Sequence, residues 1–152
     1  MTATNHVLTG AVIAGVIHNP WLALPVAFFS HFALDGLPHI GAPGLTFDSM
    51  PFKIILFTDM SVAAFVLLLL LLLAPASVWL LIACGILCAS PDLMWLQKFL
   101  AGNRHQKIPK PGPVRRFHSK VQWFERPIGS VVELAWFFAM LTILGAQLLI
   151  IR

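Results

Sequence analysis

The run IILFTDMSVAAFVLLLLLLLA, residues 54–74, decides what kind of protein this is. A helix needs about 20 apolar residues to cross the hydrocarbon core of a bilayer, which is about 30 Å thick, and this run supplies them. Residues 78–96 and 128–151 are two further stretches of this kind. All three are unbroken rather than alternating, which indicates membrane-spanning helices and not the strands of a barrel.

The composition points the same way along the whole chain. Hydrophobic residues make up 59% of the 152 residues, charged residues only 11%, and the mean hydropathy is +0.86. A soluble domain carries about 25% charged residues, so the soluble globular and disordered classes are excluded. The formal net charge is +4, but in so apolar a chain we expect no nucleic-acid partner. Cys84 and Cys88 lie inside an apolar run, where we expect packing residues and not a disulfide framework.

The first forty residues form a fourth hydrophobic block, which the turn sequence His18-Asn19-Pro20 divides. We predict two short helical segments there, over residues 7–17 and 21–37. The first segment either extends back through Thr4, with Thr4 or Asn5 as its N-cap, or is re-entrant. The prediction is therefore an all-α, polytopic integral membrane helical bundle of about five segments, of which the first two are short.

Lysine and arginine are concentrated in residues 98–126. Of the ten basic residues, only Lys53 and Arg152 lie outside that segment. The positive-inside rule places this basic loop in the cytoplasm. Counting back through the segments places the N terminus there too, with the His18 turn facing outward. We therefore expect a single multi-pass transmembrane domain, residues 1–152, in the inner (cytoplasmic) membrane of a cell.

A short amphipathic helix is predicted within the basic loop, after the proline-rich residues 108–113. Apolar residues recur there at helical spacing, with three basic side chains between them: Arg115, Arg116 and Lys120. Such a helix lies on the inner leaflet, where anionic lipid attracts it by about 1 kcal/mol per basic residue. The alternative interpretation is ordinary juxtamembrane topology charge.

Ionisable side chains gather at one depth of the predicted bundle. Each costs about 2.5–3.5 kcal/mol at the centre of a bilayer on insertion scales, so their presence requires a reason. The opposite half of the bundle, which includes residues 66–73 and 144–151, is almost without polar atoms. We therefore predict a shared polar site just inside the cytoplasmic interface, built from His6, His31, Asp35, His39, Asp59, Asp92, His118, Glu125 and Glu133.

The spacing within this layer is typical of metal ligands. His31, Asp35 and His39 recur every four residues, which places them on one helix face. A histidine with a carboxylate one turn away is a common ligand pair for zinc or another divalent ion. Asp92 follows Pro91, which disturbs the helix and frees carbonyl groups. His118 and Glu125 are seven residues apart, again on one helical face, whereas Asp59 and Glu133 either orient histidines or act as general bases.

Several of these motifs resemble those of the membrane-bound metal-dependent hydrolases, the YdjM-like proteins. Residues 4–10, TNHVLTG, look like the T-x-H start of their N-terminal helix, and residues 30–35, SHFALD, like their S-H-x-x-x-D segment. Residues 90–93, SPDL, are similar to their P-D-hydrophobic motif, and residues 116–119, RFHS, share the final His-Ser of another. The match is partial and the motif order is altered. The resemblance implies a hydrolase whose metal ligands are His6, His31, Asp35, Asp92 and His118.

The leading functional hypothesis is accordingly a metal-dependent hydrolase, with zinc as the expected cofactor. The metal would activate a water molecule, and Asp59, Glu125 or Glu133 would serve as general base. Arg115, Arg116 and Lys120 would bind an anionic group, which favours a phosphoester in a lipid or a nucleotide. A site buried in the membrane further suggests anionic lipid or a lipid-linked substrate as partner.

Two other classes of function fit the same residues. Intramembrane carboxylates and histidines also mark the ion paths of metal-ion or proton transporters. A small apolar chain can equally be an accessory or structural subunit, either as a homo-oligomer or within a larger membrane complex.

Overall fold

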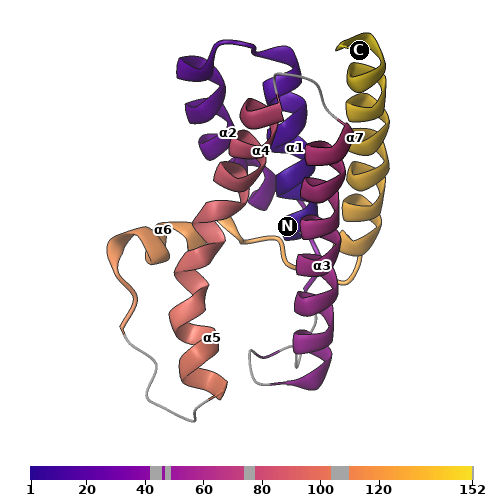
Figure 1. The fold of residues 1–152 in the computed structure, drawn as a ribbon. Helices are drawn as coiled ribbons and strands as arrows, with labels where there is room; N and C mark the ends of the chain where they lie inside the picture. The colour runs from indigo at the N-terminus through magenta and orange to yellow at the C-terminus, as the bar shows by residue number, and fades with distance from the viewer. Residues whose placement is uncertain (42–45, 47–48, 74–77, 104–109, 152) are drawn as a thin grey trace.

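The computed structural model describes residues 1–41, 46, 49–73, 78–103 and 110–151 (Figure 1). Within these ranges the chain is helical, and the single β-type contact is an isolated parallel bridge between His39 and Glu125. The prediction of an all-α helical bundle is thereby confirmed. Asp48 and His105 lie outside the described residues.

The first two helices form a short hairpin, as predicted. Helix α1 covers Ala3–Val16 and α2 covers Pro20–Asp35. Their lengths of about 21 Å and about 24 Å fall short of the hydrocarbon thickness. Asn19 accounts for the turn between them, because its side chain accepts a hydrogen bond from the backbone N–H of Trp21 at 2.9 Å and Pro20 follows at the first helical position.

Three helical stretches are long and apolar enough to cross a membrane: Met50–Leu73, Val78–Ala101 and Gly129–Ile150. The first is α3 (Met50–Leu73) and the third belongs to α7 (Gly129–Ile151). The second is continuous but changes its winding, from α4 (Val78–Ala89) through the 3₁₀ segment η1 (Ser90–Trp95) to α5 (Leu96–Asn103). Pro91 explains the change, because a proline inside an α-helix removes a backbone hydrogen bond.

Helix α1 lies in the middle of the bundle, in contact with α2, α3, α4 and α7. Figure 1 shows the α1–α2 turn and the C-terminal end of α7 at the top of the view, the N terminus at mid-height, and α5 with the start of α3 at the bottom. The side chains of the outer helices are largely apolar and exposed, as in Leu72 and Trp79. An apolar exterior around a polar centre is the arrangement expected of a protein surrounded by lipid.

Helix α6 (Pro113–Val121) is the predicted amphipathic helix. Its buried residues are the polar Arg115 and His118, whereas Val114 and Phe117 are exposed. The helix thus turns Arg115 and His118 toward the bundle, and it exposes the apolar Val114 and Phe117 together with the charged Arg116 and Lys120. An exposed surface with both apolar and basic side chains suits the interface of a membrane, and the orientation of the helix brings His118 into the interior.

Helices α1 and α4 are in close backbone contact. A Cβ atom added to Gly10 would overlap the carbonyl oxygen of Cys84 and lie 2.8 Å from the Cα atom of Gly85. The two backbones therefore pack without intervening side chains, as small residues allow in membrane helices. Cys84 and Cys88 are buried free cysteines beside this contact, as their apolar setting predicted.

We expect Gly10→Ala to destabilise the fold by about 1–3 kcal/mol, because the added methyl group forces the two backbones apart. Unfolding of the protein in detergent micelles would measure this loss. Gly145→Ala on α7 is the matched control, since a Cβ atom there meets nothing within 4 Å. Equal stability of the two variants would contradict the close contact.

Candidate metal centre

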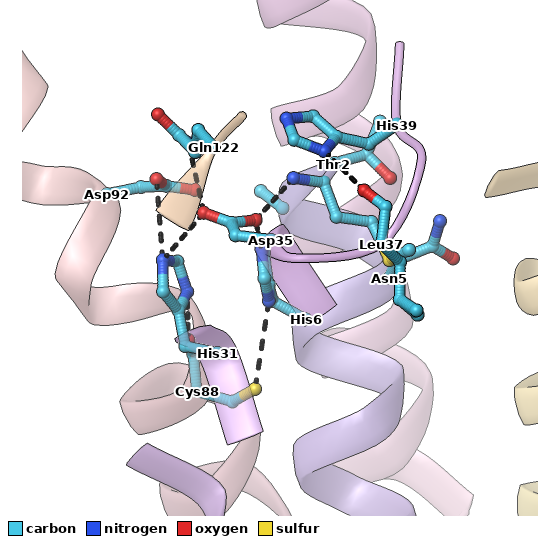
Figure 2. A network of polar contacts seen from close by, with 12 residues as sticks. Thr2, Asn5, His6, His31, Asp35, Leu37, His39, Cys88, Asp92 and Gln122 are labelled. Atoms are coloured by element: carbon cyan, nitrogen blue, oxygen red, sulfur yellow. Dashed lines mark hydrogen bonds and ion pairs between the residues drawn. The ribbon is translucent and has the colours of Figure 1, made fainter. Parts of the chain in front are cut away.

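The carboxylate of Asp35, the last residue of α2, is fully buried and lies at the centre of a polar network (Figure 2). Its Oδ2 atom lies 2.6 Å from Nε2 of His118 and 3.2 Å from Nε2 of His31. Gln122 donates to the same oxygen at 2.9 Å. The Oδ1 atom lies 3.1 Å from Nε2 of His6 and accepts from the N-terminal ammonium group. One side chain is therefore contacted by the N terminus, by α1, α2 and α6, and by the residue that follows α6.

Four side chains of this network present atoms that metals bind. One ligand atom from each of His31, Asp35, Asp92 and His118 lies within 4.8 Å of all the others. The two Nε2 atoms are 3.0 Å apart, and Asp92 Oδ1 lies 3.7 and 3.9 Å from them. Zinc bonds of about 2.0–2.1 Å to nitrogen and oxygen place tetrahedral ligand atoms about 3.3 Å apart. The distances among the four atoms, from 2.6 Å between Asp35 Oδ2 and His118 Nε2 to less than 4.8 Å, lie on both sides of this spacing, so small shifts of the side chains would bring them around one divalent ion.

The contacts behind the histidines orient them for this purpose. Nδ1 of His31 donates to the backbone carbonyl of Cys88 at 2.8 Å, so a neutral ring carries its lone pair on Nε2, toward the group. Nδ1 of His118 lies 3.1 Å from the sulfur of Met94. Both rings are fixed through Nδ1, on the side away from Asp35, so Nε2 of each ring points toward the group.

Local sequence explains how these four residues meet. His31 and Asp35 are one turn apart on α2, and the 3₁₀ winding after Pro91 turns Asp92 toward them. Pro113 begins α6, which carries His118 to the same place. His31, Asp35 and His118 have no exposed side-chain surface, whereas the Asp92 side chain is 31% exposed. The group therefore opens to its surroundings at Asp92.

His6 adjoins the four-residue group without belonging to it. Its ring stacks on that of His31, with 4.1 Å between the centroids, and its Nδ1 atom lies 3.9 Å from the Cys88 sulfur. Through Asp35 Oδ1 it supports the carboxylate from the side opposite His118. Its predicted role as a ligand stays a prediction.

His39 and Glu125 form a separate pair. The prediction that His39 continues the helical face of His31 is wrong, because α2 ends at Asp35 and Gly36 and Pro38 follow. Likewise α6 ends at Val121, so Glu125 does not share a helical face with His118. Nε2 of His39 lies 3.6 Å from Oε1 of Glu125, and this neighbour lowers the pKa of the Glu125 carboxyl group below its usual value.

Asp59 and Glu133 bind the start of α1. Asp59 accepts from the backbone N–H groups of Ala3 and Thr4 at 2.7 and 3.0 Å, and from the Thr4 hydroxyl at 2.6 Å. Glu133 accepts from the backbone N–H groups of Thr2 and Ile40, both at 2.9 Å. These two carboxylates, from α3 and α7, thus satisfy the free N–H groups of a helix start. Their predicted role as general base stays a prediction.

The predicted N-cap of α1 is therefore corrected. The helix begins at Ala3, with Thr2 in the cap position and no side-chain hydrogen bond from it. Thr4 and Asn5 lie inside the helix and are buried. The capping acceptors come from other helices, which a search for local cap residues does not find.

The three basic residues predicted to bind substrate differ in position. Arg115 is 9% exposed and lines a cavity of about 290 Å³ between η1, α5 and α6. Arg116 and Lys120 are exposed, and Arg116 donates to the backbone carbonyl of Pro111. Of the three, Arg115 is the one that shares the buried side of α6 with His118.

Sequence reasoning missed several members of the network. Gln122, which donates to Asp35, follows His118 by four residues, and this spacing was its one available signal. The Cys88 carbonyl and the Met94 sulfur had none, because a backbone carbonyl and a methionine are common everywhere in membrane helices. A comparison with protein families, curated proteins and solved structures finds no match to this chain.

We expect Asp59→Ala to lower the stability of the fold by about 1–3 kcal/mol, because it leaves two N–H groups of α1 without their acceptor. Asp59→Asn should recover part of the loss, since its amide oxygen still accepts. The control is Ser61→Ala, because the Ser61 hydroxyl bonds only within its own helix, to the Phe57 carbonyl. Unfolding in micelles would show the order, and an Asp59→Ala protein as stable as the control would disprove the capping role.

Proposed function

We propose that this chain is a membrane-embedded, metal-dependent hydrolase with a single divalent ion bound within the group of His31, Asp35, Asp92 and His118. The observation that carries the proposal is the convergence of two imidazole nitrogens and two carboxylate oxygens within 4.8 Å. Three separate segments supply them, and apolar helices surround them. Four such groups are costly to bury together unless a cation binds them.

Zinc suits this ligand set. Two imidazoles and two carboxylates are ligands that zinc accepts, and a net charge of −2 on the carboxylates balances a divalent ion. When bound, the ion supplies a Lewis acid, which lowers the pKa of a water in its open position to about 7 and makes that water a nucleophile. Tetrahedral coordination by only three of the four residues would leave such a position.

Asp92 is the residue best placed to leave that position and to accept the proton. Its Oδ1 atom lies farther from the two histidine nitrogens than Oδ2 of Asp35 does. Among the four side chains of the group, that of Asp92 is the one that is partly exposed. We therefore assign to the Asp92 carboxylate the removal of a proton from the attacking water. His31, Asp35 and His118 hold the ion, Gln122 and His6 orient Asp35, and the Cys88 carbonyl fixes the His31 tautomer.

The surroundings of the group favour an anionic substrate presented from the membrane. Arg115 lies one turn before His118, and guanidinium groups bind phosphate with paired hydrogen bonds. Basic residues concentrated in residues 98–126 support a cytoplasmic location of this end of the bundle, in an inner membrane. The proposed reaction is hydrolysis of a phosphoester in a lipid or nucleotide. The motif resemblance to the YdjM-like hydrolases supports the same class.

A structural role for the network is the second candidate. Asp35 accepts hydrogen bonds from Gln122 and the N-terminal ammonium group as well as contacting three histidines. With one imidazole protonated, these bonds alone can stabilise the carboxylate, as in an accessory subunit without metal. Metal content separates the two candidates.

We expect the purified protein to contain close to one zinc ion per chain, and His31→Ala and Asp35→Ala to contain almost none, because each removes a ligand. Mass spectrometry of the metal in detergent-solubilised protein would measure this. His18→Ala is the control, since His18 is an exposed residue at the α1–α2 turn. A wild-type protein without stoichiometric metal after zinc loading would refute the proposal.

Asp92→Asn separates ion binding from catalysis. We expect this variant to keep its metal on the three remaining ligands and to hydrolyse a generic phosphoester, such as bis-p-nitrophenyl phosphate, at least about 100-fold more slowly. Hydrolysis at the wild-type rate would overturn the role of Asp92 as proton acceptor.

A further inference from the structure

The cavity beside the metal-ligand group has the charge of an anion site. It has a volume of about 290 Å³ and is lined by residues of η1, of α5, of the segment before α6 and of the start of α6, which include Leu93, Met94, Gln97, Lys110, Val114 and Arg115. Among the described lining residues there are two cationic side chains and no carboxylate. A lysine and an arginine in one hollow favour a phosphate or another small anion.

Two residues connect this cavity to the metal-ligand group. Met94 lines the cavity, and its sulfur lies 3.1 Å from Nδ1 of His118. Arg115 lines it from the same helix that carries His118, one turn away. A molecule in the cavity therefore lies next to the residues that would hold the ion. Leu93, which lines the cavity, is also the residue that follows Asp92 in η1.

The size of the cavity discriminates between the two classes of phosphoester. Sites for whole small molecules measure about 300–1,000 Å³, so this one is at the lower limit. It accommodates a phosphate with the first atoms attached to it. A nucleotide also requires room for a sugar and a base, with hydrogen-bonding groups for the base, and the lining offers chiefly apolar side chains apart from Gln97 and the two cations.

The rim of the cavity is apolar and faces outward. Leu93 is 69% exposed, Val114 is 60% exposed, and Leu96 and Phe117 continue this surface on α5 and α6. In a membrane-spanning protein, large apolar side chains that are exposed in this way are favourable where they contact lipid. A substrate with a charged head and a hydrocarbon tail would place both parts favourably, the head on Arg115 and Lys110 and the tail along Leu93 and Val114.

We propose that this cavity binds the phosphate headgroup of a membrane lipid, which enters from the bilayer between α5 and α6. The claim that this lipid is the substrate of the hydrolase rests on the proposed function. The binding itself rests only on the cavity, its two cations and its apolar rim.

The test measures binding without turnover. The probe is the dihexanoyl phosphonate analogue of phosphatidate, in which a P–C bond replaces the ester bond, titrated calorimetrically into the full-length protein in detergent. Dihexanoylglycerol, which lacks the phosphate, and adenosine monophosphate, which lacks the tail, are the comparison ligands. We expect both to bind at least about tenfold more weakly than the phosphonate lipid, because each forfeits one of the two sets of contacts.

Variants locate the site. Arg115→Gln and Lys110→Gln should each weaken binding of the phosphonate lipid by about tenfold, since each removes a charged hydrogen bond to the headgroup. Arg116→Gln is the matched control, because Arg116 is the exposed neighbour of Arg115 on the same helix and lines no part of the cavity. Lys110 precedes α6 and is exposed, so its variant tests the site even if loss of the buried Arg115 disturbs the helix.

Three results would overturn the proposal: nucleotide binding as tight as that of the phosphonate lipid, equal binding of dihexanoylglycerol, or unchanged affinity in Lys110→Gln. Failure of the hydrolase proposal is recognised separately, by absent metal or absent hydrolysis in a protein that still binds the phosphonate lipid. A protein that binds metal and hydrolyses phosphoesters but does not bind the phosphonate lipid would show that the lipid-binding proposal alone has failed.

Discussion

The structure depends on how it buries one carboxylate. Asp35 has no exposed surface, and the transfer of an unpaired carboxylate from water into a protein interior costs several kcal/mol. Its contacts come from the start of the chain, from α1, from its own helix and from both α6 and the residue after it: Met1, His6, His31, His118 and Gln122. Because each contact has a direction and a length, the carboxylate specifies where these segments meet. A bundle held only by apolar packing would tolerate sliding of one helix along another, whereas this one has a single register at the level of Asp35.

Two other acidic side chains, Asp59 and Glu133, also hold segments of the bundle together, through the start of α1. Asp59 and Glu133 bind the first N–H groups of α1, and the helix dipole adds to the attraction. Helix α1 can therefore lie in the middle of the bundle with its polar first turn buried. Without these acceptors, the free N–H groups of that turn would be unsatisfied in the membrane, which is costly. The polar layer has two parts as a consequence. One part binds the first N–H groups of α1, and the other, from His31 to Asp92 and His118, brings imidazole nitrogens and carboxylate oxygens together. This division is the reason to seek the chemistry at Asp92 and not at Asp59 or Glu133.

Much of the architecture was predictable because the bilayer imposes simple rules on a chain. The predicted stretches are helical over residues 54–73, 78–96 and 129–151, since a backbone in lipid must satisfy its own hydrogen bonds. The turn at Asn19 and the changed winding after Pro91 also follow from local chemistry. The i, i+4 spacing of His31 and Asp35 predicted a pair on one face, and the structure places them 3.2 Å apart. His39 failed the same rule because Gly36 and Pro38 end the helix before it.

By itself, the sequence determined that the chain is helical, that it is a membrane protein, and that its ionisable groups share one level, because helix length, hydropathy and the cost of buried charge are local properties of residues. Only the tertiary structure decided which members of that level touch. Asp92 and His118 join His31 and Asp35, while Asp59 and Glu133 bind α1 and Glu125 pairs with His39. The rotation of α6, which turns His118 and Arg115 inward, was equally a tertiary outcome. Such choices depend on the angles and distances between helices, and these follow from packing over the whole bundle, including the contact of Gly10 with α4, and not from the spacing of residues along any one helix.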